Sequence, residues 1–274
     1  MQIGIFAKTF AGAGAEAVFT AVRAAGYETA QFNMACVGLP SMPDDITAET
    51  IAEVAKASRA SGVAIAAVSA TYNMIHPDYR LREEGLRRLG VILRAARGLG
   101  TGLVTLCTGT RDAEDQWRYH PDNASAAAWH DLLTEMEKAV ALAEDCGIDL
   151  GIEPELGNVV SSPQKARRLI GEILSPRVRI VLDPANLFET ATVMERRDIV
   201  AAAADRLGGH IAMAHAKDRN AKGEVVAAGQ GVIDFPHFIA CLRDVGFDGP
   251  LVTHGLSAAE APAVAAFLRE IAAR

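Results

Sequence analysis

Two hydrophobic patterns alternate along the whole chain. Short, nearly continuous apolar runs are typical of parallel strands covered on both faces, and longer segments between them carry apolar residues at helical spacing. The runs predict eight strands, at residues 3–6, 29–32, 65–69, 103–107, 149–152, 179–182, 211–214 and 250–253. Helix ends are predicted at Gly26, Gly62 and Gly147, and a helix start at Ser162–Pro163. The final helix is expected over residues 259–273.

Eight strands that are each followed by a helix predict one domain over residues 1–274, a single (β/α)₈ TIM barrel. An open doubly wound sheet is the alternative fold, and it often has a glycine-rich turn directly after the first strand. The candidate for such a turn, residues 11–14, lies too far past the first strand and lacks a third glycine. The barrel is therefore the predicted fold.

Charge and cysteine content restrict the partners and the compartment. The chain has 27 Lys and Arg against 34 Asp and Glu, a formal net charge of −7. This balance argues against a nucleic-acid or acidic membrane partner and favours a small polar substrate. The four cysteines are far apart and form no C-x-x-C pair, and neither a signal peptide nor a membrane span is evident. We expect a cytoplasmic protein.

Four consecutive predicted strands end at residues that commonly bind metals. These residues are Glu153, Asp183, His215 and His254. Because consecutive strands of a barrel are neighbours, the four side chains are expected to converge on one half of the carboxyl-terminal rim. Two carboxylates and two imidazoles suit one divalent metal ion such as Mn²⁺, Co²⁺, Fe²⁺ or Zn²⁺ better than Ca²⁺. The alternative is that they are unrelated polar residues at strand ends.

Five motifs give the chain a family resemblance. They are IEP at 152–154, LDPAN at 182–186, HAKD at 215–218, G-x-G-x-I-D-F at 229–235 and GFDGPLV at 246–252. With these motifs the chain resembles, over essentially its whole length, the sugar isomerase/epimerase superfamily of xylose-isomerase-like barrels. We expect the G-x-G run to shape a turn rather than to bind phosphate, which favours an unphosphorylated substrate.

The resemblance implies one divalent ion bound by Glu, Asp, His and Glu from strands five to eight. Glu153, Asp183 and His215 match this pattern, but His254 stands where the last Glu is expected. Asn186 likewise stands where many relatives carry His, and it cannot act as a base near neutral pH. Homodimers and homotetramers are frequent in that family.

The implied activity is an isomerase or epimerase reaction on a small-molecule carbohydrate, a keto-sugar or polyol derivative. A proton moves next to a carbonyl through a metal-stabilised enediolate. We expect Glu153 to act as the base and His254 or Lys217 to return the proton.

Loops that follow predicted strands three and four, at residues 71–79 and 108–122, should lie on the active face of a barrel. Residues expected to contact the substrate are Tyr72, His76, Arg111, Trp117, Glu155 and Asn186. For His76 the alternative is a hydrogen bond that stabilises its loop, and for Glu155 it is a surface ion pair. Lys217 could instead be a solvated loop lysine.

Three other functions are compatible with this barrel. A metal-dependent lyase or hydratase acting on a keto-sugar or inosose would use the same enolate and then expel a β-substituent, and the loss of the second Glu favours it. An apurinic endonuclease needs several metals and a basic face, which the net charge of −7 opposes. A metal-free sugar-binding barrel would bind no divalent ion.

Overall fold

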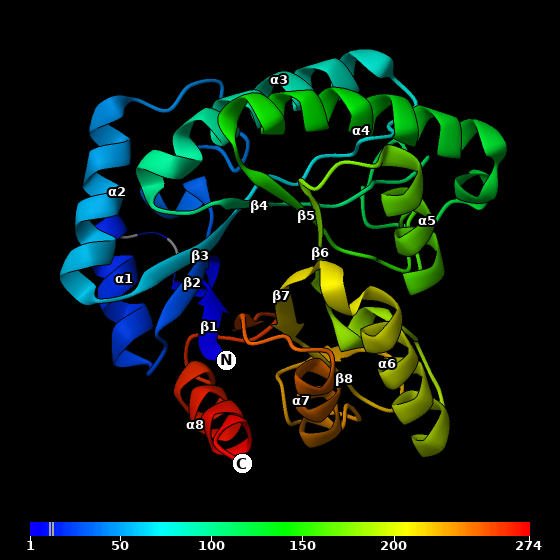
Figure 1. The fold of residues 1–274 in the computed structure, drawn as a ribbon. Coiled ribbons are helices and arrows are strands. Elements are labelled where there is room, and N and C mark those ends of the chain that lie inside the picture. The colour runs from blue at the N-terminus through cyan, green and yellow to red at the C-terminus, as the bar shows by residue number, and fades with distance from the viewer. Residues whose placement is uncertain (11, 13) are drawn as a thin grey trace.

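The protein is a closed parallel barrel surrounded by helices. A computed structural model describes residues 1–10, 12 and 14–274. Eight strands follow one another around the barrel in the order β1-β10-β7-β6-β5-β4-β3-β2, and the helices lie outside them (Figure 1). The predicted (β/α)₈ fold is confirmed, and the open-sheet alternative is wrong because β1 pairs with both β2 and β10. Of the segment considered as a glycine-rich turn, Ala11 and Ala13 lie outside the described residues.

All eight predicted strands are present, with bounds that differ by at most two residues. The barrel strands are β1 (Gln2–Phe6), β2 (Thr29–Phe32), β3 (Ala64–Ser69), β4 (Leu103–Leu106), β5 (Asp149–Ile152), β6 (Val178–Leu182), β7 (Ile211–Ala216) and β10 (Pro250–Thr253). His215 therefore lies within β7 rather than beyond it. A two-stranded hairpin of β8 (Asp218–Arg219) and β9 (Val225–Val226) was not predicted, because two residues are too few to show a period.

Helices cover the outside of the barrel. The α-helices are α1 (Gly14–Ala24), α2 (Ala48–Ser61), α3 (Tyr79–Leu99), α4 (Ala126–Cys146), α5 (Pro163–Ile173), α6 (Val193–Leu207), α7 (Phe235–Asp244) and α8 (Ala261–Ala272). The 3₁₀ helices are η1 (Ala7–Phe10), η2 (Met34–Val37), η3 (Pro121–Ala124), η4 (Pro184–Asn186) and η5 (Gly208–His210). None of the helices among the described residues has both the length and the apolarity needed to cross a membrane.

The predicted helix ends at glycine and the predicted start at serine are confirmed. Gly62 and Gly147 end α2 and α4 in the left-handed conformation, with φ of 69° and 66°. Ser162 caps the start of α5 by accepting a hydrogen bond from Lys165 N at 3.2 Å, and Pro163 is the first helical residue. These local signals fix where each helix meets the loop that follows or precedes it.

A small apolar cluster, separate from the main core, indicates which way the side chains at the rim point. Its buried members are Ala67, Leu103, Val181, Met213 and Val252. Side chains alternate along a strand, so residues two positions further on point to the same face. Asp183, His215 and His254 each come two residues after a member of this cluster. The strands thus direct these side chains to the carboxyl-terminal mouth of the barrel.

Candidate metal centre and its cavity

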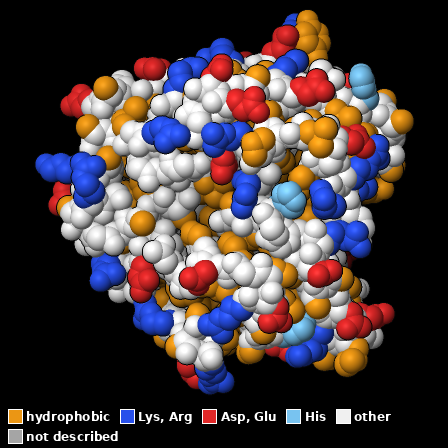
Figure 2. Space-filling model, in the orientation of Figure 1, with side chains coloured by type: hydrophobic (Ala, Val, Ile, Leu, Met, Phe, Trp, Pro, Cys, Tyr) orange, Lys and Arg blue, Asp and Glu red, His pale blue; other side chains and the backbone are white. Residues whose placement is uncertain are grey.

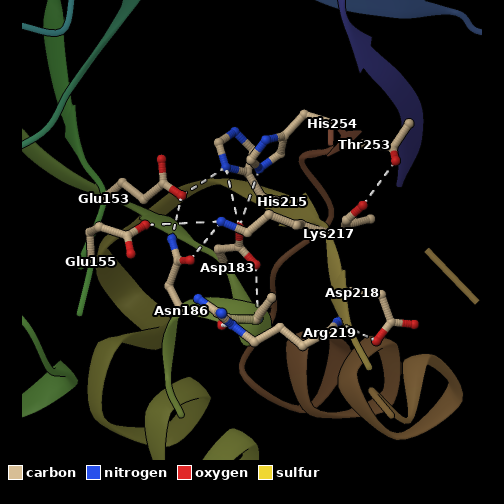
Figure 3. A network of polar contacts seen from close by, with 12 residues as sticks. Glu153, Glu155, Asp183, Asn186, His215, Lys217, Asp218, Arg219, Thr253 and His254 are labelled. Carbon is tan, nitrogen blue, oxygen red and sulfur yellow. Dashed lines mark hydrogen bonds and ion pairs between the residues drawn. The ribbon is translucent and has the colours of Figure 1, made fainter. Parts of the chain in front are cut away.

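The ends of β5, β6, β7 and β10 bring two carboxylates and two imidazoles together (Figure 3). One ligand atom from each of Glu153, Asp183, His215 and His254 lies within 4.8 Å of the other three. His215 Nδ1 is 3.2 Å from Glu153 Oε1, and His254 Nε2 is 3.3 Å from Asp183 Oδ2. Asp183 and His215 are buried, and the other two are partly buried. This cluster could hold a metal ion.

Gln31, at the end of β2, determines which nitrogen of His215 faces the cluster. His215 Nε2 donates to Gln31 Oε1 at 2.8 Å, and Gln31 Nε2 donates to Thr105 Oγ1 at 3.0 Å. With its proton on Nε2, the neutral ring directs the Nδ1 lone pair at the Glu153 carboxylate, and a cation between these two acceptors would bind both. A divalent ion fits this position. The sequence analysis did not single out Gln31, although it is a polar residue in an otherwise apolar strand.

Replacing Gln31 with methionine should weaken metal binding about 10–100-fold, because a partner that orients a ligating histidine is lost while the side-chain length is kept. The measurement is titration of the metal-free protein with Mn²⁺. Thr105→Val, which removes only the far anchor of Gln31, should have a smaller effect. Unchanged affinity in Gln31→Met would show that Gln31 does not orient His215.

Lys217 and Asn186 connect the two carboxylates of the cluster. Lys217 Nζ donates to Asn186 Oδ1 at 2.6 Å and lies 3.1 Å from Asp183 Oδ2. Asn186 Nδ2 in turn donates to Glu153 Oε1 at 2.8 Å. Both polar atoms of the Asn186 amide are therefore engaged, the nitrogen with Glu153 and the oxygen with Lys217. Glu155, two residues after Glu153, lies 3.9 Å from the Lys217 ammonium.

Burial and neighbouring charges shift the pKa values of Asp183 and Lys217 in opposite directions. Burial would raise the pKa of Asp183, but Lys217 and His254 outweigh it and hold the pKa well below its usual range. Burial would lower the pKa of Lys217, but Asp183 and the two nearby glutamates raise it above its ordinary value. Burial raises the pKa of Glu155 to about 7. Asp183 is therefore a carboxylate and Lys217 an ammonium ion near neutral pH.

The cluster forms one side of a cavity of about 550 Å³. Predicted site residues on its wall are Trp117, Glu153, Glu155, His215, Lys217 and His254. Residues on its wall that the sequence analysis did not name are Phe6, Lys8, Gln31, Asn33, Ser41, Ser69, Thr71, Gln116, Arg219, Val225 and Gly255. Most of the latter come from the ends of β1 to β3 and from the β8–β9 hairpin. A cavity of this size suits a small ligand.

Tyr72 and His76 do not line the cavity of about 550 Å³. The Tyr72 side chain is buried, and its hydroxyl donates to Glu135 Oε1 at 3.0 Å. The His76 ring bridges its own loop to the next, since Nε2 is 3.0 Å from Ala113 O and Nδ1 accepts from Asp78 N. His76 lines a second cavity, of about 380 Å³, which shares Gln116 and Trp117 with the first.

Arg111 also points away from the larger cavity. Its guanidinium donates to Ile75 O at 3.1 Å and to Asp131 Oδ2 at 2.6 Å. Arg82 lies 3.1 Å from the same Asp131 oxygen. The arginine thus fastens the loops after β3 and β4 to α4.

Asp131→Asn should reduce stability at neutral pH by about 1 kcal/mol and flatten the acid limb of the stability curve. Burial would raise the pKa of Asp131, but Arg111 and Arg82 outweigh it and hold the pKa below its usual range. The contribution is therefore present above the ordinary aspartate pKa of about 4 and is lost as pH falls through the folded-state value. The test is urea denaturation of both proteins from pH 7 down to pH 3; parallel curves would contradict it.

The G-x-G turn near the site has no backbone donors to spare for phosphate. The N–H groups of Gly229 and Gly231 donate to Asp218 Oδ2 at 3.1 and 2.9 Å, and Ile233 N donates to Oδ1 at 3.0 Å. Position 231 also needs glycine, because a Cβ there would lie 2.1 Å from Arg219 O. This arrangement agrees with the predicted role of the run as a turn former.

A closed (β/α)₈ barrel with a carboxylate–imidazole cluster at its carboxyl-terminal mouth defines the class of protein. The family model described as "Xylose isomerase-like TIM barrel" matches residues 19–271. The chain therefore belongs to the xylose isomerase-like TIM-barrel family, as its motifs predicted.

Solved structures of several relatives share the fold. The 3-keto-D-glucoside 4-epimerase of E. coli superposes with a TM-score of 0.77 at 18% identity, covering 98% of this chain and 99% of its own. D-psicose 3-epimerase of Clostridium cellulolyticum H10, solved with D-tagatose, gives 0.76 at 15% identity, covering 99% of each chain. The IolI protein, solved with zinc, gives 0.75 at 15% identity, covering 100% of this chain and 98% of its own. A comparison with curated proteins finds no match.

Proposed function

We propose that this protein is a divalent-metal-dependent sugar isomerase or epimerase that moves a proton next to a carbonyl of a small keto-sugar or polyol derivative. The convergence of Glu153, Asp183, His215 and His254 carries this proposal, because three of the four, Glu153, His215 and His254, line a sugar-sized cavity. The relatives that are sugar epimerases support the substrate class. Either zinc, which a relative contains, or Mn²⁺, Co²⁺ or Fe²⁺ suits the donor set.

Each residue of the site has its own proposed role in the reaction. When bound, a divalent ion supplies Lewis-acid polarisation of the substrate carbonyl. Glu153 is the proposed base: Oε1 accepts a hydrogen bond from Asn186 and lies beside His215 Nδ1, and no hydrogen bond among the described residues uses Oε2. The Lys217 ammonium faces the developing negative charge of the enediolate. His254 or Lys217 returns the proton.

A metal-dependent lyase or hydratase is the second candidate. By the resemblance, His254 stands where the family has its second glutamate, and this substitution speaks against a symmetric exchange between two glutamates. An imidazole there suits protonation of a leaving group as well as reprotonation of carbon. A nucleic-acid substrate is less suited, since the net charge is −7 and basic and acidic side chains are interspersed on the face in Figure 2.

The test is incubation of the metal-loaded protein with a panel of keto-sugars, keto-glycosides and inososes in D₂O. Deuterium appearing next to the carbonyl, followed by NMR, would support the proposal for any member of the panel. Epimeric or isomeric products identify an isomerase, and loss of water or of an aglycone identifies a lyase. Protein that binds the ion and a sugar but exchanges no proton would contradict both enzymatic proposals.

A further inference from the structure

Lys217 brings a positive charge into the place where a metal ion would bind. The residue is 8% exposed, and its ammonium contacts Asn186, Asp183 and Glu155 (Figure 3). Asp183 Oδ2, which is 3.1 Å from Lys217 Nζ, is also the oxygen that faces His254 at 3.3 Å. A metal ion on that oxygen and the lysine ammonium would therefore be close neighbours.

The charges of the site are balanced by one divalent ion. With all three carboxylates ionised, Glu153, Glu155, Asp183 and Lys217 together carry a net charge of −2. Without the lysine the same group would carry −3. A buried group of carboxylates with no cation is strongly unfavourable, so the lysine stabilises the ligand set before any ion arrives.

We propose that Lys217 is an internal counter-cation that keeps the ligand residues assembled in the metal-free protein and lowers their affinity for a divalent ion. Repulsion between the ammonium and the ion weakens binding, because both act on Asp183 across a few ångströms of poorly solvated space. The ion is consequently bound less tightly and dissociates more readily than it would without the lysine. This inference rests on the proposed metal site, and it assigns Lys217 a role besides any part in proton transfer.

The experiment is calorimetric titration of the metal-free protein with Mn²⁺ at one fixed pH above 7, so that the Glu155 carboxyl, with a pKa of about 7, is mostly ionised. Lys217→Met keeps the chain length and removes the charge, and its Kd should fall at least about tenfold below the wild type. Lys217→Arg keeps the charge, so its Kd should stay closer to that of the wild type than the Kd of Lys217→Met does. Lys8→Met is the matched control: it removes a lysine from the wall of the same cavity, and no ion pair joins Lys8 to the four ligands among the described residues. Its Kd should stay within about threefold of the wild type.

A double variant separates the effect of the lost positive charge from the effect of the altered side-chain shape at position 217. Lys217→Met combined with Glu155→Gln restores the net charge of −2, so its Kd should return to within a few-fold of the wild type. In thermal denaturation without metal, Lys217→Met should unfold at a lower temperature than the wild type. Saturating Mn²⁺ should close that gap, because the ion replaces the missing positive charge.

The outcomes distinguish this inference from the proposed metal site. Mn²⁺ binding that is equal or weaker in Lys217→Met, with the wild type binding normally, overturns the inference and leaves the site intact. Absence of binding in the wild type and in every variant overturns both. Binding by Lys217→Met alone would support the effect of the lysine on affinity but would contradict the proposed metal dependence of the wild type.

Discussion

Replacing Glu153 with glutamine is expected to reduce proton exchange next to the substrate carbonyl by about 10²–10⁴-fold. The amide keeps the size of the side chain and one oxygen that can contact a metal, but it cannot accept a proton near neutral pH. The readout is the initial rate of deuterium uptake by the keto-sugar that the wild type exchanges fastest, with the metal content measured on the same samples.

Glu155→Gln is the matched control for this experiment. It makes the same chemical change two residues further along the chain, on the wall of the same cavity but outside the four-residue cluster. The rate of deuterium exchange should fall much less in Glu155→Gln than in Glu153→Gln. Full exchange by Glu153→Gln with the metal still bound would remove Glu153 from the role of base.

Replacing Asp183 with asparagine is expected to abolish metal binding, a larger loss than the about 10–100-fold that follows removal of a residue orienting a ligand. Asp183 is buried, and its Oδ2 lies within 4 Å of His215, Lys217 and His254, which places this oxygen at the centre of the cluster. Metal content of protein purified without chelators, measured by elemental analysis, tests this directly. About one Mn, Co, Fe or Zn per wild-type chain is expected.

Asp131→Asn controls for the general effect of losing a paired aspartate, because that carboxylate pairs with Arg111 and Arg82 outside the cavity. It should retain the metal. Circular dichroism would show whether Asp183→Asn remains folded, since the substitution leaves Lys217 with less compensating charge. If neither the wild type nor the variants bind Mn²⁺ or Co²⁺, a metal-free sugar-binding barrel becomes the better description.

The residues of the carboxylate–imidazole cluster could be predicted from sequence to lie together because their placement depends on local rules. An apolar run marks a strand, and the residue at the end of that strand lies at the carboxyl-terminal rim of the barrel. Consecutive strands are neighbours, so the residues at their ends lie side by side. Glu153, Asp183 and His254 follow from these rules alone. Even with its strand longer than predicted, His215 keeps its face, because the alternation of side chains along β7 does not depend on where the strand ends.

The sequence by itself thus determined the barrel, its strand order and the residue types that meet at one rim. Only the tertiary structure decided which neighbours these residues have. Gln31 reaches His215 across 184 residues of chain, and Lys217 turns inward to Asp183 while Arg111 turns outward to Asp131. The reason is physical: a strand period fixes which face a residue occupies, but the direction of a long polar side chain is set by hydrogen-bond partners from distant segments.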